Sequence, residues 1–150
     1  MSYVVDTDVL SRTSPSTAQS IPGLREWLAR NSDQLHLSVV SLTEISYGIA
    51  WLRHRKAQRK AALLQAWLDD VVAFHQGRII AIGADIAVRA GQPLGRARAS
   101  GTEVSAEDAL IAATADLGAM TVITANARHF APMRVRYADP LAGLPPDAVS

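Results

Sequence analysis

The stretch YVVDTDVLS, residues 3–11, decides how this chain folds, because an apolar run ends directly in two carboxylates. Residues 3–5 favour a buried β-strand, and the polar residues 6–8 would end that strand in a loop. In open parallel α/β sheets, ligands bind at the carboxyl ends of the strands. The pattern therefore favours a functional acid here. Asp6 is either a metal ligand or, in a DxDxV motif with Asp8, the nucleophile of a phosphoryl-transfer enzyme.

Composition narrows the class of protein. The chain has 150 residues, of which 49% are hydrophobic and 19% charged, which indicates one globular domain with a substantial core. The absence of cysteine excludes disulfides, zinc–thiolate sites and cysteine catalysis, and fits a reducing, cytoplasmic location. We expect no signal peptide, because the N-terminus enters a strand directly, without a basic segment followed by an apolar one. We expect no membrane span, because no apolar run approaches about 20 residues. A net charge of +1 means that any nucleic-acid binding must come from a local patch.

Hydrophobic patterning predicts an α/β fold. Apolar runs predict strands at residues 3–5, 35–38, 78–81, 121–124 and 135–137. Helical spacing predicts helices at residues 24–31, 42–54, 59–74, 84–100 and 106–117, with Pro93 and Gly95 interrupting the fourth. Strands that alternate with helices predict a mostly parallel sheet of about five strands, covered on both faces. We expect a domain over residues 1–140, an irregular loop at 12–21, and a surface tail at 141–150.

A second acid, Glu44, follows the second predicted strand. The stretch Ser41-Leu42-Thr43-Glu44 matches a capping box, in which the serine caps a helix and the glutamate bonds back to it. The apolar residues of this helix form one face, and Glu44 lies off that face. The spacing therefore leaves two interpretations open for Glu44, a solvent-exposed cap or a functional acid.

A third acid, Asp108, lies at the start of a helix that is apolar on nearly every side, with Ser105 as its cap. A charge there is costly unless it is paired, so Asp108 either interacts with the helix amides or joins a cluster of acids held by a metal. Asn126 follows the strand at 121–124 as Asp6 follows the first strand. If these strands are neighbours, Asp6, Asp108 and Asn126 converge at one crevice.

Basic and aromatic residues suggest contact surfaces. The stretch RHRKAQRK, residues 53–60, is either the solvated tip of a helical hairpin or a phosphate-contacting patch. Candidates for binding a nucleic-acid backbone are Arg55, Arg89, Arg96 and Arg98. Tyr47 and Trp51 lie away from the apolar face of their helix, which leaves a subunit interface and a second internal packing face equally open.

Taken together, YVVDTDVLS, SVVSLTEISYGI, SAEDALIAATA and VITANARHF resemble, in this order and spacing, the PIN-domain ribonucleases, in particular the VapC-type toxins of bacterial toxin–antitoxin pairs. The resemblance implies a three-layer α/β/α fold with acids at the carboxyl end of the sheet. It also implies Mg²⁺ or Mn²⁺ as cofactor and hydrolysis of RNA phosphodiester bonds. The partners that it implies are an RNA substrate, a cognate antitoxin and a second copy of the chain in a homodimer.

Residue by residue, the resemblance matches Asp6, Glu44 and Asp108 to the three acids of the family, as metal ligands and catalytic residues. Asn126 falls where relatives carry Asp or Asn, and is the fourth catalytic candidate. His129 falls in a stretch where many relatives have Asp. With neutral residues at both positions, it is undecided whether this chain has the family's second metal site. Asp8 replaces a residue that is commonly Asn, and would be a neighbour of the site.

Two other functions compete with this interpretation. A non-catalytic PIN-like module would bind RNA or protein without cleaving it. A haloacid-dehalogenase-type phosphatase would use Asp6 as nucleophile, but it requires a later lysine, and no lysine follows Lys60. Serine-type catalysis has little support, because no G-x-S-x-G motif is present.

Overall fold

The computed structural model describes residues 1–148 and contains a parallel sheet of five strands. The strands are β1 (Tyr3–Val5), β2 (Leu35–Ser38), β3 (Ile79–Ile80), β4 (Thr121–Ile123) and β5 (Tyr137–Ala138). Their order across the sheet is β3-β2-β1-β4-β5, and every neighbouring pair is parallel. The predicted parallel sheet of about five strands is therefore confirmed, although β3 is shorter than predicted and β5 begins two residues later.

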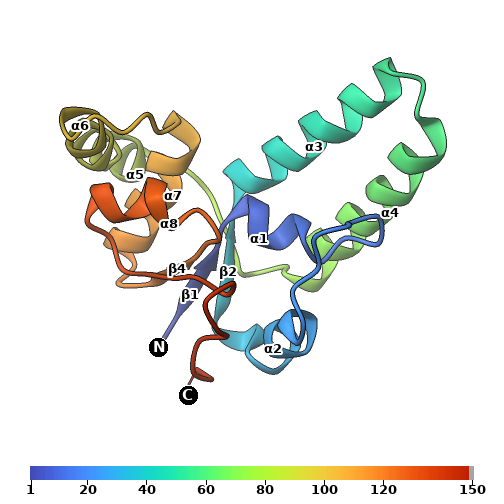
Figure 1. Ribbon diagram of the computed structural model, residues 1–150, viewed down its shortest axis with the longest axis horizontal. Coiled ribbons are helices and arrows are strands. Elements are labelled where there is room, and N and C mark those ends of the chain that lie inside the picture. The colour runs from blue at the N-terminus through green and yellow to red at the C-terminus, as the bar shows by residue number, and fades with distance from the viewer. Residues whose placement is uncertain (149–150) are drawn as a thin grey trace.

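The helices cover both faces of this sheet (Figure 1). They are α1 (Thr7–Ser11), α2 (Leu24–Arg30), α3 (Val39–His54), α4 (Gln58–Phe74), α5 (Ala84–Arg89), α6 (Gly91–Ala99), α7 (Ala106–Leu117) and α8 (Ala127–Phe130), with short 3-10 turns η1 (Ser32–Gln34) and η2 (Ala131–Met133). No helix within residues 1–148 is long and apolar enough to cross a membrane.

Alternate residues of the strands pack into two separate hydrophobic clusters. Val4 and Val122 contribute to the cluster that also contains buried residues of α5, α6 and α7. Tyr3, Val5 and Ile123 contribute to the other, with buried residues of α1, α2, α3 and α4. Because successive strand side chains point to opposite faces, this alternation produces the three layers of the α/β/α fold.

The strand order places a topological switch point between β1 and β4. From β1 the chain continues through β2 to β3 in one direction, and it then crosses back to add β4 and β5 on the other side of β1. Ligands of open α/β sheets bind where the strand order reverses, outside the carboxyl ends of the strands. Asp6 follows β1 at this position, directly beside the end of β4.

Two segments that follow strands differ from the prediction. The residues after Asp6 form the short helix α1, not a loop, because the Asp6 carboxylate caps that helix by accepting the N–H of Thr7. Helix α3 begins at Val39 and not at Leu42, because Ser38 Oγ accepts the N–H of Val40 and caps the helix three residues earlier. The prediction of a capping box at Ser41–Glu44 is therefore wrong.

Two further boundaries also differ. The predicted helix over residues 84–100 is broken at Ala90, and Pro93 and Gly95 lie inside α6. Pro93 is tolerated because it lies in the first turn of that helix, where its missing N–H leaves no helical bond unmade. At the C-terminus, the surface tail is fastened to the domain: Trp27 Nε1 donates to the Pro145 carbonyl at 2.8 Å, and the Tyr3 hydroxyl donates to the Pro146 carbonyl at 2.9 Å.

Candidate active site

Asp6 is the most deeply buried acid of the predicted site, with 3% of its surface exposed. Both carboxylate oxygens accept hydrogen bonds: Oδ1 from the N–H of Thr7 at 2.8 Å and Oδ2 from Thr124 Oγ1 at 2.9 Å. Each oxygen has two lone pairs, so both retain acceptor capacity for a further ligand. The two hydrogen bonds hold the carboxylate in one orientation at the end of β1.

Thr124 and Asn126 follow β4 and approach Asp6 from the neighbouring strand. The buried Thr124 hydroxyl donates to Asp6 and accepts the backbone N–H of Asn126 at 2.9 Å. Asn126 is half-buried at the start of α8. The predicted convergence of Asp6 and Asn126 at adjacent strand ends is therefore observed, with Thr124 between them.

Glu44 enters the same region from α3, on the other side of β1. Thr7 Oγ1 donates to Glu44 Oε1 at 2.7 Å, and Ser41 Oγ lies 2.8 Å from the same threonine hydroxyl. Glu44 is half-buried and bonded to a residue next to Asp6, so the interpretation of Glu44 as a solvent-exposed cap is wrong. Because α3 begins at Val39, Glu44 lies in the second turn of its helix, where its carboxylate faces α1.

Asp108 lies in the first turn of α7, as predicted, with Ser105 Oγ accepting its backbone N–H at 3.1 Å. Its Oδ2 lies 3.1 Å from His129 Nδ1, and both side chains are largely buried. Burial raises the pKa of Asp108, and the charge of His129 and the hydrogen bond from His129 oppose this rise. The contact links α7 to α8 and places His129 beside the acids.

The three acids interact electrostatically. Burial raises the pKa of Asp6 from 3.8 to about 7, the hydrogen bonds from Thr124 and Thr7 oppose this rise, and the charges of Asp108 and Glu44 add to it. The pKa of Glu44 is also raised, first by burial and then by the charges of Asp108 and Glu107. The site therefore concentrates negative charge that is poorly solvated, an environment that a bound cation would stabilise.

The side chains fit a hard divalent cation by their chemistry. Among residues 1–148, no three Asp, Glu or His side chains form a ready-made group that could hold a metal ion. Mg²⁺, however, is usually held by one or two carboxylates together with waters and substrate phosphate oxygens, and not by a cage of protein ligands. The all-oxygen donors of Asp6, Glu44 and Asp108 match that preference.

The predicted RNA-binding arginines lie on two separate parts of the molecule. Arg55 is exposed at the tip of the α3–α4 hairpin, whereas the other three lie on α5 and α6, on the opposite side of the molecule from that tip (Figure 1). Arg89 forms an ion pair with Asp116, with Nη2 and Oδ2 2.7 Å apart, and Arg96 donates to the Met133 carbonyl. The four arginines therefore do not form one continuous patch.

Three site residues were missed from the sequence: Thr7, Ser41 and Thr124. Thr7 is adjacent to Asp6, and Thr124 directly follows β4 as Asp6 directly follows β1, so position at the sheet edge was the available signal. Asp8 is directed elsewhere, because it forms an ion pair with Arg12 at 3.1 Å. Because Asp8 is paired with Arg12, its position does not support a role as the second acid of a DxDxV phosphatase.

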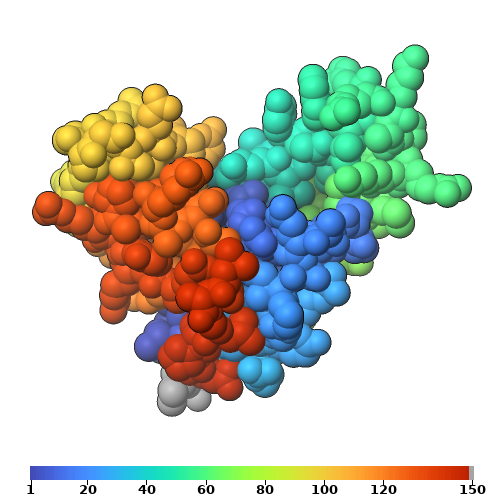
Figure 2. Space-filling model, viewed as in Figure 1, coloured from blue at the N-terminus to red at the C-terminus, as the bar shows by residue number. Residues whose placement is uncertain are grey.

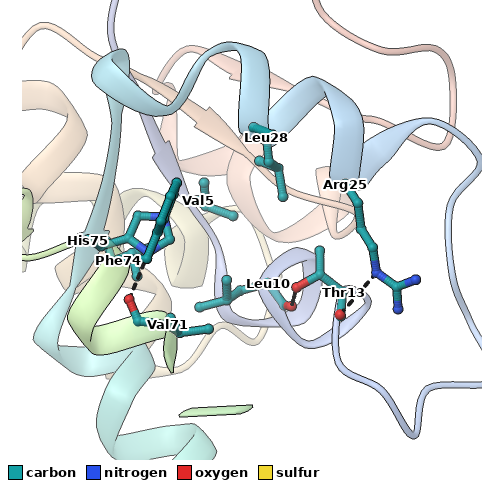
Figure 3. A pocket seen from close by; sticks show the side chains of 10 residues that line it. Val5, Leu10, Thr13, Arg25, Leu28, Val71, Phe74 and His75 are labelled. Atoms are coloured by element: carbon teal, nitrogen blue, oxygen red, sulfur yellow. Dashed lines mark hydrogen bonds between the residues drawn. The ribbon is translucent and has the colours of Figure 1, made fainter. Parts of the chain in front are cut away.

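A cavity between α1, α2 and α4 has none of the acids in its lining. It has a volume of about 220 Å³ and is lined mainly by apolar side chains, among them Leu10, Leu28 and Phe74 (Figure 3). At its edge, Arg25 Nε donates to the Thr13 carbonyl, and His75 Nδ1 donates to the Val71 carbonyl at 2.9 Å. Burial lowers the pKa of His75 and favours its neutral form. None of the predicted site residues lines this cavity.

Comparison with known proteins agrees with this architecture. A family model described as PIN domain matches residues 3–134. Ribonuclease VapC10 of Mycobacterium tuberculosis is 32% identical over 141 residues, which span 93% of this chain and 92% of that protein. Toxin FitB of Neisseria gonorrhoeae is 28% identical over 128 residues, 85% of this chain and 89% of that protein. The crystal structure of FitAcB from Neisseria gonorrhoeae superposes with a TM-score of 0.79 at 27% identity, covering 93% of this chain and 98% of that chain.

Proposed function

This chain belongs to the PIN-domain family, and from that membership and the grouped acids we propose that it is a metal-dependent ribonuclease. It hydrolyses RNA phosphodiester bonds and acts as the toxin of a toxin–antitoxin pair. The observation that carries the proposal is the meeting of Asp6, Glu44 and Asp108, whose charges act on one another at the switch point of the sheet. The relatives named ribonuclease and toxin support it.

Asp6 and Asp108 are proposed to hold a Mg²⁺ or Mn²⁺ ion, directly or through water. When bound, such an ion neutralises phosphate charge and lowers the pKa of an attacking water. Thr124 and Thr7 fix the orientation of the Asp6 carboxylate through the two hydrogen bonds that it accepts. Pre-oriented ligands avoid the reorganisation that would otherwise oppose the reaction.

Glu44 is proposed to orient the attacking water or to hold a water of the cation. Its carboxylate is positioned by Thr7, so one threonine serves both acids: its amide binds Asp6 and its hydroxyl binds Glu44. Asn126 is proposed to contribute its side-chain carbonyl oxygen. Hydrolysis then adds water to phosphorus and breaks a P–O ester bond, with no covalent intermediate on the protein.

The test is cleavage of RNA by the purified protein in Mg²⁺ or Mn²⁺, compared with the same reaction in chelator. We expect Asp6→Asn and Asp108→Asn to abolish cleavage, with circular dichroism spectra that match the wild type. Asp8→Asn is the matched control, because Asp8 is paired with Arg12 outside the site, and it should cleave normally. Equal cleavage in chelator, or full activity in Asp108→Asn, would contradict the proposal.

As a toxin, the chain is proposed to form a homodimer and to bind a small antitoxin that blocks the acids. Tyr47 and Trp51 are 69% and 53% exposed, so packing within this chain leaves both aromatic rings largely uncovered. The test is to mix the protein with the product of the neighbouring gene and to measure inhibition of cleavage. Light scattering of the toxin alone should give the mass of two chains.

A non-catalytic binding module remains the second candidate. It is favoured by one observation, that no three acidic or imidazole side chains in residues 1–148 form a ready-made metal group. Such a module would bind RNA equally well in chelator and in Mg²⁺, and would leave the RNA intact. The cleavage experiment above separates the two functions directly.

A further inference from the structure

A cavity opens between α3 and α7, directly beside the proposed active site. Its volume is about 690 Å³, within the range of small-molecule binding sites. Figure 2 shows the surface hollowed between α3, in teal, and the start of α7, in yellow-orange. Glu44, Thr43 and Tyr47 line it from α3, and Ser105, Glu107 and Leu110 from the α7 side. Because Glu44 belongs to both the cavity and the acid site, an occupant of the cavity would be adjacent to the reacting phosphate.

Tyr47 presents an aromatic ring to this cavity. It lies three residues after Glu44 on α3, so the two side chains project from the same side of the helix. With 69% of its surface exposed, the ring is not part of either hydrophobic cluster. Proteins that bind single-stranded RNA use exposed aromatic rings of this kind to stack on unpaired bases.

The charges around the cavity favour a base over a phosphate group. Its charged lining residues, Glu44 and Glu107, are both acids, and neither lysine nor arginine lines it. A phosphate would be repelled, whereas a neutral base with N–H donors would be accepted. Guanine offers two adjacent donors, N1–H and N2–H, which match the two oxygens of one carboxylate. Glu107 lies in the first turn of α7, and its exposed side chain can reach such an edge.

We propose that this cavity is the subsite for the base next to the scissile phosphate, with Tyr47 stacking on the base and Glu107 accepting from its edge, and with guanine preferred. The proposal rests on the proposed ribonuclease function. It names RNA, not a protein, as the occupant, because the cavity shares Glu44 with the acids and offers both a stacking ring and a hydrogen-bond acceptor.

The first experiment measures cleavage of short uridine oligonucleotides that carry one internal G, A or C. In Mg²⁺, Tyr47→Ala should raise KM by about tenfold to a hundredfold, the usual effect of losing one base stack. Tyr47→Phe keeps the ring and should behave as wild type. Tyr137→Ala is the control, since it removes an exposed aromatic of β5 outside this cavity and outside α3.

Binding is measured separately in the Asp6→Asn background, by fluorescence anisotropy with the same oligonucleotides. Tyr47→Ala should weaken binding by a similar factor, and Tyr137→Ala should not. If wild type cleaves RNA but Tyr47→Ala binds and cleaves as wild type does, the subsite proposal is overturned and the ribonuclease function stands. If wild type does not cleave any RNA, the proposed function itself has failed.

Base preference tests Glu107. Glu107→Gln should lose the preference for cleavage next to guanine, while Glu103→Gln, an exposed acid three residues before the helix start, should keep it. Unchanged preference in Glu107→Gln would contradict the edge contact. If Tyr47→Ala leaves cleavage intact but abolishes inhibition by the product of the neighbouring gene, the cavity binds a protein and the proposal is wrong.

Discussion

Thr124 donates a hydrogen bond to Asp6 across 2.9 Å, and this contact joins the ends of β1 and β4, 118 residues apart in the chain. The same hydroxyl accepts the amide of Asn126. One buried side chain therefore orients the central acid and fixes the path of the backbone that leads to the fourth candidate residue. Two substitutions test this role.

Thr124→Val keeps the shape of the side chain but leaves Asp6 Oδ2 and the Asn126 amide without their partner. We expect metal affinity and kcat to fall by about tenfold to a hundredfold, the usual effect of removing an outer-shell hydrogen bond. Thr124→Ser retains the hydroxyl and should stay close to wild type. Calorimetric titration with Mn²⁺ and initial cleavage rates provide the measurement, and a Thr124→Val protein with normal values would count against this role.

The stability of the metal-free protein should fall as pH rises from about 4 to about 7. Burial raises the pKa of Asp6 to about 7, and the pKa values of Glu44 and Asp108 are also raised. In this window the folded protein binds more protons than the unfolded chain, so raising the pH favours unfolding. At about 1.4 kcal/mol per pKa unit, the raised pKa of Asp6 alone lowers the free energy of unfolding by up to a few kcal/mol across this window.

Urea denaturation in chelator at several pH values measures this dependence. Asp6→Asn removes the group with the largest shift and should flatten the curve, whereas Asp8→Asn should leave its slope unchanged. A metal-free wild type that became more stable between pH 5 and pH 7 would show that the acids are better solvated than the structure indicates.

Mn²⁺ should raise the melting temperature of the wild-type protein, because a ligand that binds only the folded state stabilises it by mass action. At a hundred times the Kd the gain is about 2.7 kcal/mol. Asp6→Asn and Asp108→Asn should lose most of this gain, and each should melt at or above the metal-free wild type because one repelling charge is gone. A thermal scan that shows the same Mn²⁺ shift in Asp6→Asn would place the ion elsewhere.

Removing residues 145–150 should destabilise the domain, because this segment accepts hydrogen bonds from side chains of the core. The truncation leaves Trp27 Nε1 without its acceptor. It also removes the carbonyl acceptor of the Tyr3 hydroxyl, which retains only the weak acceptor Met1 Sδ. A buried donor without a partner costs about 1–3 kcal/mol. Chemical denaturation should show this loss, while cleavage below the melting temperature stays normal. Unchanged stability would mean that the tail contributes nothing to the fold.

Much of the fold was predictable because it depends on local patterns. The bounds of β1 and β2, the helix over residues 106–117 and its Ser105 cap follow from apolar periodicity and capping chemistry within a few residues. The start of α3 was not predicted, since the β-branched residues Val39 and Val40 resemble a strand. Ser38 nevertheless caps a helix there.

For the site, the sequence by itself determined which acids exist and that Asp6 and Asn126 end strands of one parallel sheet. Only the tertiary structure decided that β1 and β4 are neighbours, that Thr7 bonds Glu44, and that His129 contacts Asp108. The physical reason is that strand order and helix docking are set by long-range burial of apolar surface. That burial joins residues far apart in the chain, and no local pattern encodes which of them will meet.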